Sequence, residues 1–161
     1  MLLETSFDIK NIICLHLYDL KDTINLYNLN KDHQDNVRIT NLYDIAKHVY
    51  KLNQKIIEQN KYRCVEKLYA YDNEKIKNVN HMKKTLKKLN CCGSNNGIDQ
   101  NGISELNLIE LRTNNNKKIK NVNHMKETLK ILYCIRESGI DQKGISELNL
   151  IELYAFDNNK I

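Results

Sequence analysis

The nine residues from Ile103 to Leu111 (ISELNLIEL) return unchanged from Ile145 to Leu153. The segment from Ile76 to Lys83 (IKNVNHMK) returns in the same way from Ile119 to Lys126. Both pairs of copies give a period of about 42 residues, which is long enough for two turns of a stacked array. Because one such unit cannot bury its own apolar face, the repetition predicts units that stack on one another.

Each period divides into two units, and every unit opens with two apolar residues in an LxxL spacing. Successive pairs begin about 21 or 22 residues apart. A small or short residue follows each pair, then a polar residue and an isoleucine. The pairs are Val65/Leu68, Leu86/Leu89, Leu108/Leu111, Leu129/Leu132 and Leu150/Leu153. The alternation around the second leucine predicts a short strand with one buried face, and stacking places these strands in a parallel sheet.

The polar position after each strand predicts a turn whose side chain binds the backbone of the next coil. It is asparagine in three units, at Asn73, Asn116 and Asn158, and Ser94 and Glu137 stand there in the other two. Asparagine favours turns over helix interiors. The alternative, an amphipathic helical hairpin repeat, is therefore disfavoured because these turns would break a helix.

This pattern resembles the leucine-rich repeat family over residues 64–161. The segments Ile98 to Leu106 and Ile140 to Leu148 are similar to its cysteine-containing subtype, through the shared pattern Ile-Asp-x-x-Gly-Ile-x-x-Leu. Cys91 and Cys134 depart from that subtype because they occupy the inward strand position. The resemblance implies an α/β fold, a short solenoid of about five units with a parallel sheet on its concave face.

Residues 1–63 lack the LxxL period and are assigned to a separate helical segment, which would close the open end of the array. Asp22 or Thr23 can cap one helix, and Thr40 can cap a longer one. The apolar face of the longer helix comprises Leu42, Tyr43, Ile45, Ala46, Val49, Leu52, Ile56 and Ile57.

The start of this segment, from Phe7 to Lys31, resembles a degenerate F-box, with paired apolar residues, a Leu-Lys-Asp turn and a second helix. Ser6-Phe7 replaces the usual Leu-Pro opening. Such starts ahead of repeats are similar to F-box proteins of giant DNA viruses of amoebae. The resemblance implies a cytoplasmic protein of the host cell and a surface for a Skp-type adaptor of a cullin ubiquitin ligase. That surface would comprise Ile9, Ile12, Ile13, Leu17 and Leu20. The alternative is a plain helical cap.

The sequence contains none of the common short motifs of nucleotide-binding, zinc-dependent or serine-hydrolase sites. His81 and His124 occupy one position of the repeat and have no ligand at metal-binding spacing. Cys91 is expected to point inward and Cys92 outward, which opposes a disulfide or a shared metal. We therefore expect no catalytic site, no cofactor, no metal and no enzyme activity. No apolar run of about 18 residues occurs, so no membrane association is expected.

The formal net charge of +5 is compatible with nucleic acid as a binding partner. The lysines are interleaved with acidic residues, and Glu105 and Glu110 are expected on a solvated face. A nucleic-acid partner is therefore disfavoured.

The outward strand positions carry an unusual share of aromatic side chains. Exposed aromatic and arginine residues are typical of protein-binding hot spots. We therefore predict a protein partner on the concave face, held by Tyr69, Tyr71, Arg112, Ile131, Tyr133, Ile135, Tyr154 and Phe156. The competing interpretation is that aromatic residues merely stabilise the sheet by cross-strand stacking.

Together these features predict a non-enzymatic substrate receptor of a ubiquitin ligase. A stand-alone scaffold protein is the alternative. The sequence stops at Ile161 inside the fifth unit, which predicts either a longer array or pairing with a second copy of the chain.

Overall fold

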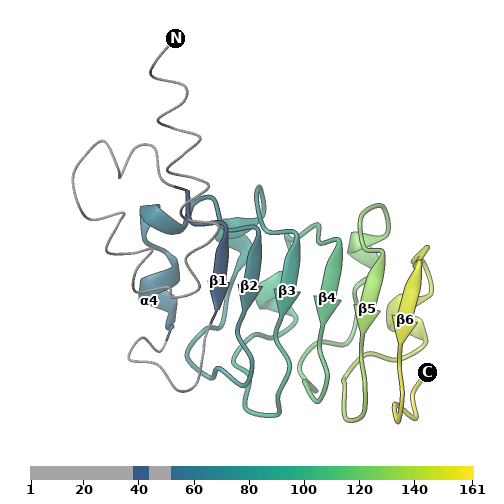
Figure 1. The fold of residues 1–161 in the computed structure, drawn as a ribbon. Coiled ribbons are helices and arrows are strands. Elements are labelled where there is room, and N and C mark those ends of the chain that lie inside the picture. The colour runs from purple at the N-terminus through teal and green to yellow at the C-terminus, as the bar shows by residue number, and fades with distance from the viewer. Residues whose placement is uncertain (1–37, 44–51) are drawn as a thin grey trace.

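One parallel sheet organises the protein (Figure 1). The computed structural model describes residues 38–43 and 52–161. The strands follow one another in chain order from β1 to β6, and each pairs in parallel with the next. They are β1 (Asn41–Tyr43), β2 (Lys67–Tyr69), β3 (Lys88–Asn90), β4 (Glu110–Arg112), β5 (Ile131–Tyr133) and β6 (Glu152–Tyr154). A parallel sheet joined by short helical turns agrees with the predicted α/β class and a repeat-like arrangement.

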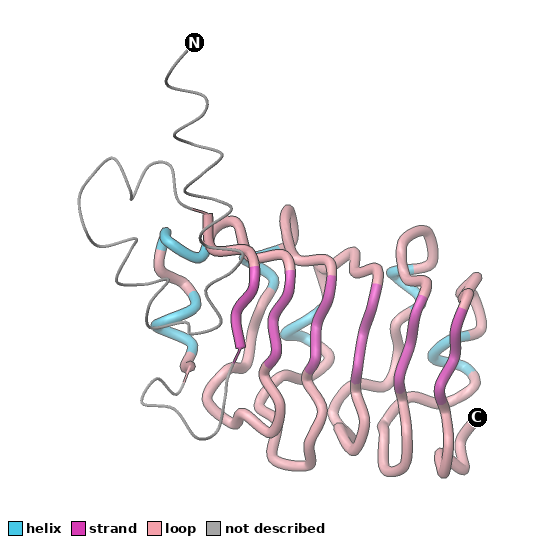
Figure 2. Tube along the Cα trace, in the orientation of Figure 1, coloured by secondary structure: helices cyan, strands magenta, loops and turns pink. Residues whose placement is uncertain are grey.

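Short helical turns return the chain from one strand to the next (Figure 2). The turns are α4 (Gln54–Ile57), η1 (Asn60–Tyr62), η2 (Asn80–Met82), η3 (Asn101–Ile103), η4 (Asn123–Met125) and η5 (Lys143–Ile145). Several of them lie behind the sheet, whereas α4 lies beside β1 at its edge (Figure 1). Asn53 caps α4, because its side chain accepts a hydrogen bond from the amide of Ile56 at 3.0 Å.

The core fills the space between the strands and the returns, in rows of equivalent residues. The second leucine of each pair forms one row, the small residue after it another, and the isoleucine beyond the turn a third. The buried members are Leu42, Leu68, Leu89, Leu111 and Leu132; Ala70, Cys91, Thr113 and Cys134; and Ile76, Ile98, Ile119 and Ile140. The predicted inward positions are confirmed for these units. In the last unit Leu153 is 43% exposed, because no further unit covers it among the described residues.

The asparagine ladder is confirmed at Asn73, Asn116 and Asn158. Asn116 donates to the carbonyls of Cys91 at 3.0 Å and Ile98 at 3.1 Å, and it accepts from the amide of Lys118. Asn158 makes the equivalent bonds to Cys134, Ile140 and Lys160. Each buried amide thus ties its own turn to the preceding unit, which satisfies backbone groups that the turn would otherwise leave unpaired.

The polar positions assigned to Ser94 and Glu137 were wrong, because in these two units the buried polar residue comes later after the strand than in the other three. Asn96 and Ser138 take the buried position instead. Asn96 donates to the carbonyl of Ala70 and accepts from the amide of Ile98. Ser138 contacts Thr113 Oγ1 at 3.1 Å, so a hydroxyl pair replaces the amide in that unit.

Each strand from β2 to β6 is followed by a residue in the left-handed backbone region. The positions are Asp72, Gly93, Asn115, Arg136 and Asp157, with φ between 51° and 109°. This conformation turns the chain sharply out of the sheet, and four of the five positions carry a side chain that makes it costly. Only glycine fits at Gly93, where an added Cβ would lie 2.5 Å from Asp72 Oδ1.

The helix predicted to begin at Thr40 is wrong at its start. Asn41–Tyr43 form β1, in which Leu42 lies in register with Leu68 and is fully buried. Ile39 and Leu42 provide the same apolar spacing as Val65 and Leu68, so the sheet gains more by taking these residues than a helix would. The sheet therefore extends into the segment assigned to the helical start.

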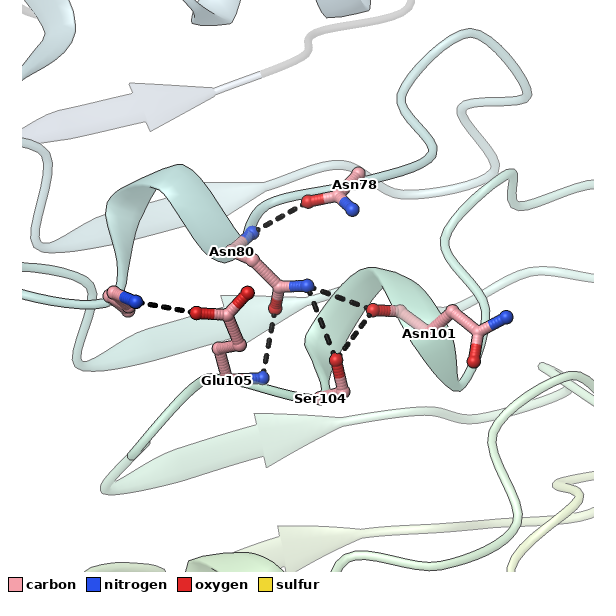
Figure 3. A network of polar contacts seen from close by, with 6 residues as sticks. Asn78, Asn80, Asn101, Ser104 and Glu105 are labelled. Carbon is pink, nitrogen blue, oxygen red and sulfur yellow. Dashed lines mark hydrogen bonds and ion pairs between the residues drawn. The ribbon is translucent and has the colours of Figure 1, made fainter.

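The returns are joined by a second polar network (Figure 3). Asn80 donates to the carbonyl of Asn101 at 2.9 Å and accepts from the amide of Glu105 at 3.1 Å. Asn123 makes the same contacts with Lys143 and Glu147. The verbatim repeat of the sequence therefore reproduces the same junction twice.

Candidate functional site

The candidate site is the outer face of the sheet, which we define as the strand side chains that flank the buried leucines. Strand register places these side chains in columns that run across the strands. The first column contains Lys67, Lys88, Glu110, Ile131 and Glu152, and the middle column Tyr69, Asn90, Arg112, Tyr133 and Tyr154. Tyr71, Asn114, Ile135 and Phe156 follow the strands.

The middle column forms a continuous stack over β4, β5 and β6. The Arg112 guanidinium carbon lies 4.2 Å from the ring centre of Tyr133. The Tyr133 and Tyr154 rings are stacked, with centroids 4.3 Å apart and planes 1° apart. Side chains fixed in this way lose little further rotamer freedom when a partner binds, which favours affinity.

A cluster of charge supports this stack from the side. The Glu110 carboxylate lies 2.8 Å from Lys88 Nζ and 2.7 Å from the Arg112 guanidinium. Burial opposes ionisation of Glu110, but the hydrogen bonds from Lys88 and Arg112 hold the pKa of its carboxyl below the ordinary value. The hydrogen bond to Glu110 also raises the pKa of Lys88. Glu110 therefore orients the guanidinium over Tyr133.

A residue of the first column, Glu152, also fixes the position of Tyr154. Its hydroxyl donates to Glu152 at 2.7 Å, and this hydrogen bond raises the pKa of Tyr154 to about 12. The phenol therefore stays neutral over the whole physiological range. The stack ends in a neutral ring with one fixed polar atom, a shape that suits both apolar and hydrogen-bonding contacts.

Apolar side chains border the stack. Phe156 is 73% exposed and Tyr154 42% exposed, whereas Ile131, Tyr133 and Ile135 are half-buried. The fold does not bury the Phe156 ring, so this edge of the outer face offers apolar surface to a partner.

The eight predicted residues thus divide into two groups. Six of them, Arg112, Ile131, Tyr133, Ile135, Tyr154 and Phe156, come from the consecutive strands β4 to β6 or directly follow them. Tyr69 and Tyr71 belong to β2 and its turn, and Asn90 separates Tyr69 from Arg112 in the column. Tyr71 is 64% exposed. The adaptor residues Ile9, Ile12, Ile13, Leu17 and Leu20 lie outside the described residues.

Two predicted orientations were wrong. Cys92 is buried, although it was expected to point outward. Glu110 is also buried, although it was assigned to a solvated face, because two cations enclose its carboxylate. Glu105 is exposed, as expected. The sequence signal for the Glu110 cluster was available, since Lys88 and Glu110 share one column of the predicted sheet and Arg112 belongs to the next.

Four cysteines and two histidines lie in the part of the chain that the structure describes. Cys64, Cys91, Cys92 and Cys134 are free thiols. Burial raises the pKa of Cys91 and of Cys92, and raises that of Cys134 to about 11. His81 and His124 lie on the surface, and the Nε2 of each is 3.2 Å from a carbonyl of the preceding unit, that of Ile57 and of Ile103.

In residues 38–43 and 52–161, no three potential ligands among His, Cys, Asp and Glu gather closely enough to hold a metal ion. Over the same ranges, no helix combines the length and apolar character needed to cross a membrane. The sequence has no significant match to a family model, to a curated protein or to a solved structure. The outer face therefore has to be interpreted from its own geometry.

Proposed function

We propose that this protein is a non-enzymatic leucine-rich repeat solenoid that binds a protein partner on the outer face of its sheet. Three features support the repeat assignment: six strands in chain order, a short helical return between successive strands, and equivalent core residues in register. The resemblance in the sequence supplies the family, and it makes the outer face the concave one.

The observation that carries the binding proposal is the stack Arg112–Tyr133–Tyr154 beside the exposed ring of Phe156. Aromatic and arginine residues dominate the binding energy of protein interfaces when they lie at the centre of a contact. Cross-strand stacking alone would account for Tyr133 and Tyr154, but it leaves the exposure of Phe156 unexplained.

Charge pairing between units favours a protein partner over nucleic acid. Lysines of one unit pair with glutamates of a neighbouring unit, so their charge is already compensated. The pairs are Lys83–Glu105, Lys87–Glu66, Lys88–Glu110, Lys117–Glu137 and Lys126–Glu147. Weak and strongly salt-dependent binding to nucleic acid is the expected result.

The partner is proposed to be a substrate delivered to a cullin-type ubiquitin ligase in the cytoplasm, and the support for this step is the F-box-like sequence of residues 7–31. Ile12→Asp with Ile13→Asp in the full chain should abolish co-purification of a Skp-type adaptor. The matched control is Tyr133→Ala with Phe156→Ala, which should retain the adaptor. If the wild-type chain retains no adaptor, the ligase proposal is refuted and the stand-alone scaffold protein is the remaining interpretation.

The binding face is tested by the same double variant against the captured partner. Tyr133→Ala with Phe156→Ala should keep the circular dichroism spectrum and lose the partner in a pull-down from host cytosol. Lys84→Ala with Glu127→Ala alters two exposed residues on the returns and should retain it. Equal capture by both double variants would refute the outer face as the binding site.

A further inference from the structure

The sequence contains two Asn-Gly dipeptides, Asn96-Gly97 and Asn101-Gly102, and both belong to the same repeat unit. An asparagine that precedes glycine is chemically labile, because the glycine carries no side chain that would shield its main-chain nitrogen from the asparagine amide. The fold treats the two dipeptides differently, since it buries Asn96 and exposes Asn101.

Asn96 is held at both reacting groups. Its side chain is fully buried, where Nδ2 donates to the carbonyl of Ala70 and Oδ1 accepts from the amide of Ile98 at 3.0 Å. The amide of Gly97 donates to the carbonyl of Asn73 at 2.8 Å. A reaction at Asn96 therefore requires that buried hydrogen bonds break first.

The side-chain amide of Asn101 is free to react. In Figure 3 it points away from Asn80 and Ser104, and it makes no hydrogen bond within the described part of the chain. The main-chain carbonyl of Asn101, in contrast, accepts from Asn80 Nδ2 at 2.9 Å and from Ser104 Oγ at 3.0 Å. Asn101 begins η3, a turn of only three residues, and such short turns open locally at a small cost in free energy.

Asp99 adds a proton acceptor at the attacking atom. The amide of Gly102 donates to Asp99 Oδ1 at 2.9 Å, which is within the reach that a general base needs. One turn thus contains a nucleophile, an acceptor for its proton and an exposed amide as the group that is attacked.

We infer that Asn101-Gly102 is a self-modification site, at which the asparagine converts to aspartate and isoaspartate without an enzyme. The Gly102 nitrogen bonds to Cγ of Asn101 while its proton passes to Asp99. The bond between Cγ and Nδ2 then breaks, and Nδ2 takes up this proton and leaves as ammonia. Water opens the resulting succinimide ring at either of its two carbonyls, which gives aspartate or isoaspartate.

Isoaspartate at this position loosens the junction between two returns. Its main chain runs through the former side chain, so one carbon is added to the backbone before Gly102. Gly102 has no room for an added atom, because a Cβ there would collide with the carbonyl of Lys77. The carbonyl of Asn101 that Asn80 binds also becomes a free carboxylate.

Ageing of the full chain at mildly alkaline pH, followed by peptide mapping with mass spectrometry, tests this inference. Asn101 should convert at least about tenfold faster than Asn96, whose buried hydrogen bonds must first break. In guanidinium chloride the two should convert at similar rates. Equal rates in the folded protein, no conversion of Asn101, or a difference that persists in denaturant would overturn the inference.

Two variants separate the parts of the reaction. Asp99→Asn keeps an acceptor for the Gly102 amide but removes the base, so it should slow conversion severalfold, and an unchanged rate would overturn the role of Asp99. Asn101→Lys copies the other unit, in which Lys143 occupies this position of the turn. It should fold as the wild type does and show no conversion in η3.

The consequence for the junction has its own control. Asn101→Asp introduces the new charge without the longer main chain. Aged wild-type protein that contains isoaspartate should therefore melt at a lower temperature than fresh Asn101→Asp. Equal melting temperatures would overturn the loosening of the junction.

Discussion

The rings of Tyr133 and Tyr154 lie parallel, with centroids 4.3 Å apart and planes only 1° apart. The two residues are register partners on the neighbouring strands β5 and β6. From the strand on the other side of β5, the Arg112 guanidinium lies over the Tyr133 ring. One column of the sheet thus carries a cation and two rings in contact. The predictions below follow from this column and from the turns that hold it.

Arg112 and Tyr133 should be energetically coupled. A double-mutant cycle with Arg112→Ala and Tyr133→Ala should give a coupling free energy of about 0.5–1 kcal/mol, the range for a cation over a ring near the surface. Urea unfolding of the four proteins measures it. The cycle that pairs Arg63→Ala with Tyr133→Ala serves as control and should give no coupling. A zero value for the first cycle would contradict the contact.

Glu110 should make stability depend on pH. Because its pKa is lower in the folded protein than the ordinary value of 4.5, its stabilising effect is present above that value and is lost as the pH falls through the lowered pKa. The free energy of unfolding of the wild type should exceed that of Glu110→Gln by about 1 kcal/mol at pH 7, and this difference should vanish in acid. Thermal unfolding at several pH values measures this.

Glu105→Gln is the control for this pH dependence. The Glu105 carboxylate is exposed and pairs with an exposed lysine, so its removal should change stability little at any pH. A pH profile of Glu105→Gln that matches that of Glu110→Gln would contradict the special role of the Glu110 cluster.

The asparagine ladder should be essential for stability. Asn116→Ala removes a buried amide and leaves two carbonyls and one amide unpaired, which should cost about 2–3 kcal/mol. Asn107→Ala changes an exposed asparagine and should stay within about 0.5 kcal/mol of wild type. Chemical unfolding compares the two. Similar losses for both variants would show that the ladder contributes nothing specific.

Glycine should be favoured at the left-handed turn positions, so removing it should lower stability and introducing it should raise stability. Gly93→Ala should destabilise by about 2 kcal/mol or more, because φ is 109° and the new Cβ would meet Asp72. Arg136→Gly relieves a strained position and should stabilise by about 0.5–1 kcal/mol. Melting temperatures distinguish these outcomes, and a loss of stability in Arg136→Gly would refute the strain at that turn.

The buried thiols should resist alkylation. Cys91 and Cys92 are buried with raised pKa values, and Cys134 has a pKa of about 11, so few thiolates form at pH 8. Cys64 is half-buried and should react with iodoacetamide before the other three cysteines that the structure describes. Mass spectrometry of native and urea-unfolded protein provides the comparison. Fast labelling of Cys91 in the native protein would contradict the inward position.

Much of this architecture could be predicted from the repetition. The period located the inward leucines and small residues, because equivalent residues of stacked units must occupy equivalent places. The first strand was missed since Ile39 and Leu42 lie 26 residues before Val65 and Leu68, outside the period. A pattern of apolar residues alone did not separate a strand from the start of a helix there.

The remaining errors concern turns and charges. Asn96 and Ser138, rather than Ser94 and Glu137, occupy the buried polar position. The distance of this position from the preceding strand varies between units, and a fixed spacing cannot register that. Glu110 was misplaced because its burial depends on two cations, Arg112 from its own strand and Lys88 from the neighbouring strand, which the register brings opposite Glu110.

Site-specific photo-crosslinking tests the central claim most directly. A photoreactive phenylalanine analogue placed at Phe156, and separately at Lys84 on the returns, is irradiated in a cell extract. We predict a discrete protein adduct from position 156 that excess unlabelled wild-type protein competes away, and no such adduct from position 84. Absence of a competed adduct at position 156, or the same adduct from position 84, would contradict a protein-binding outer face.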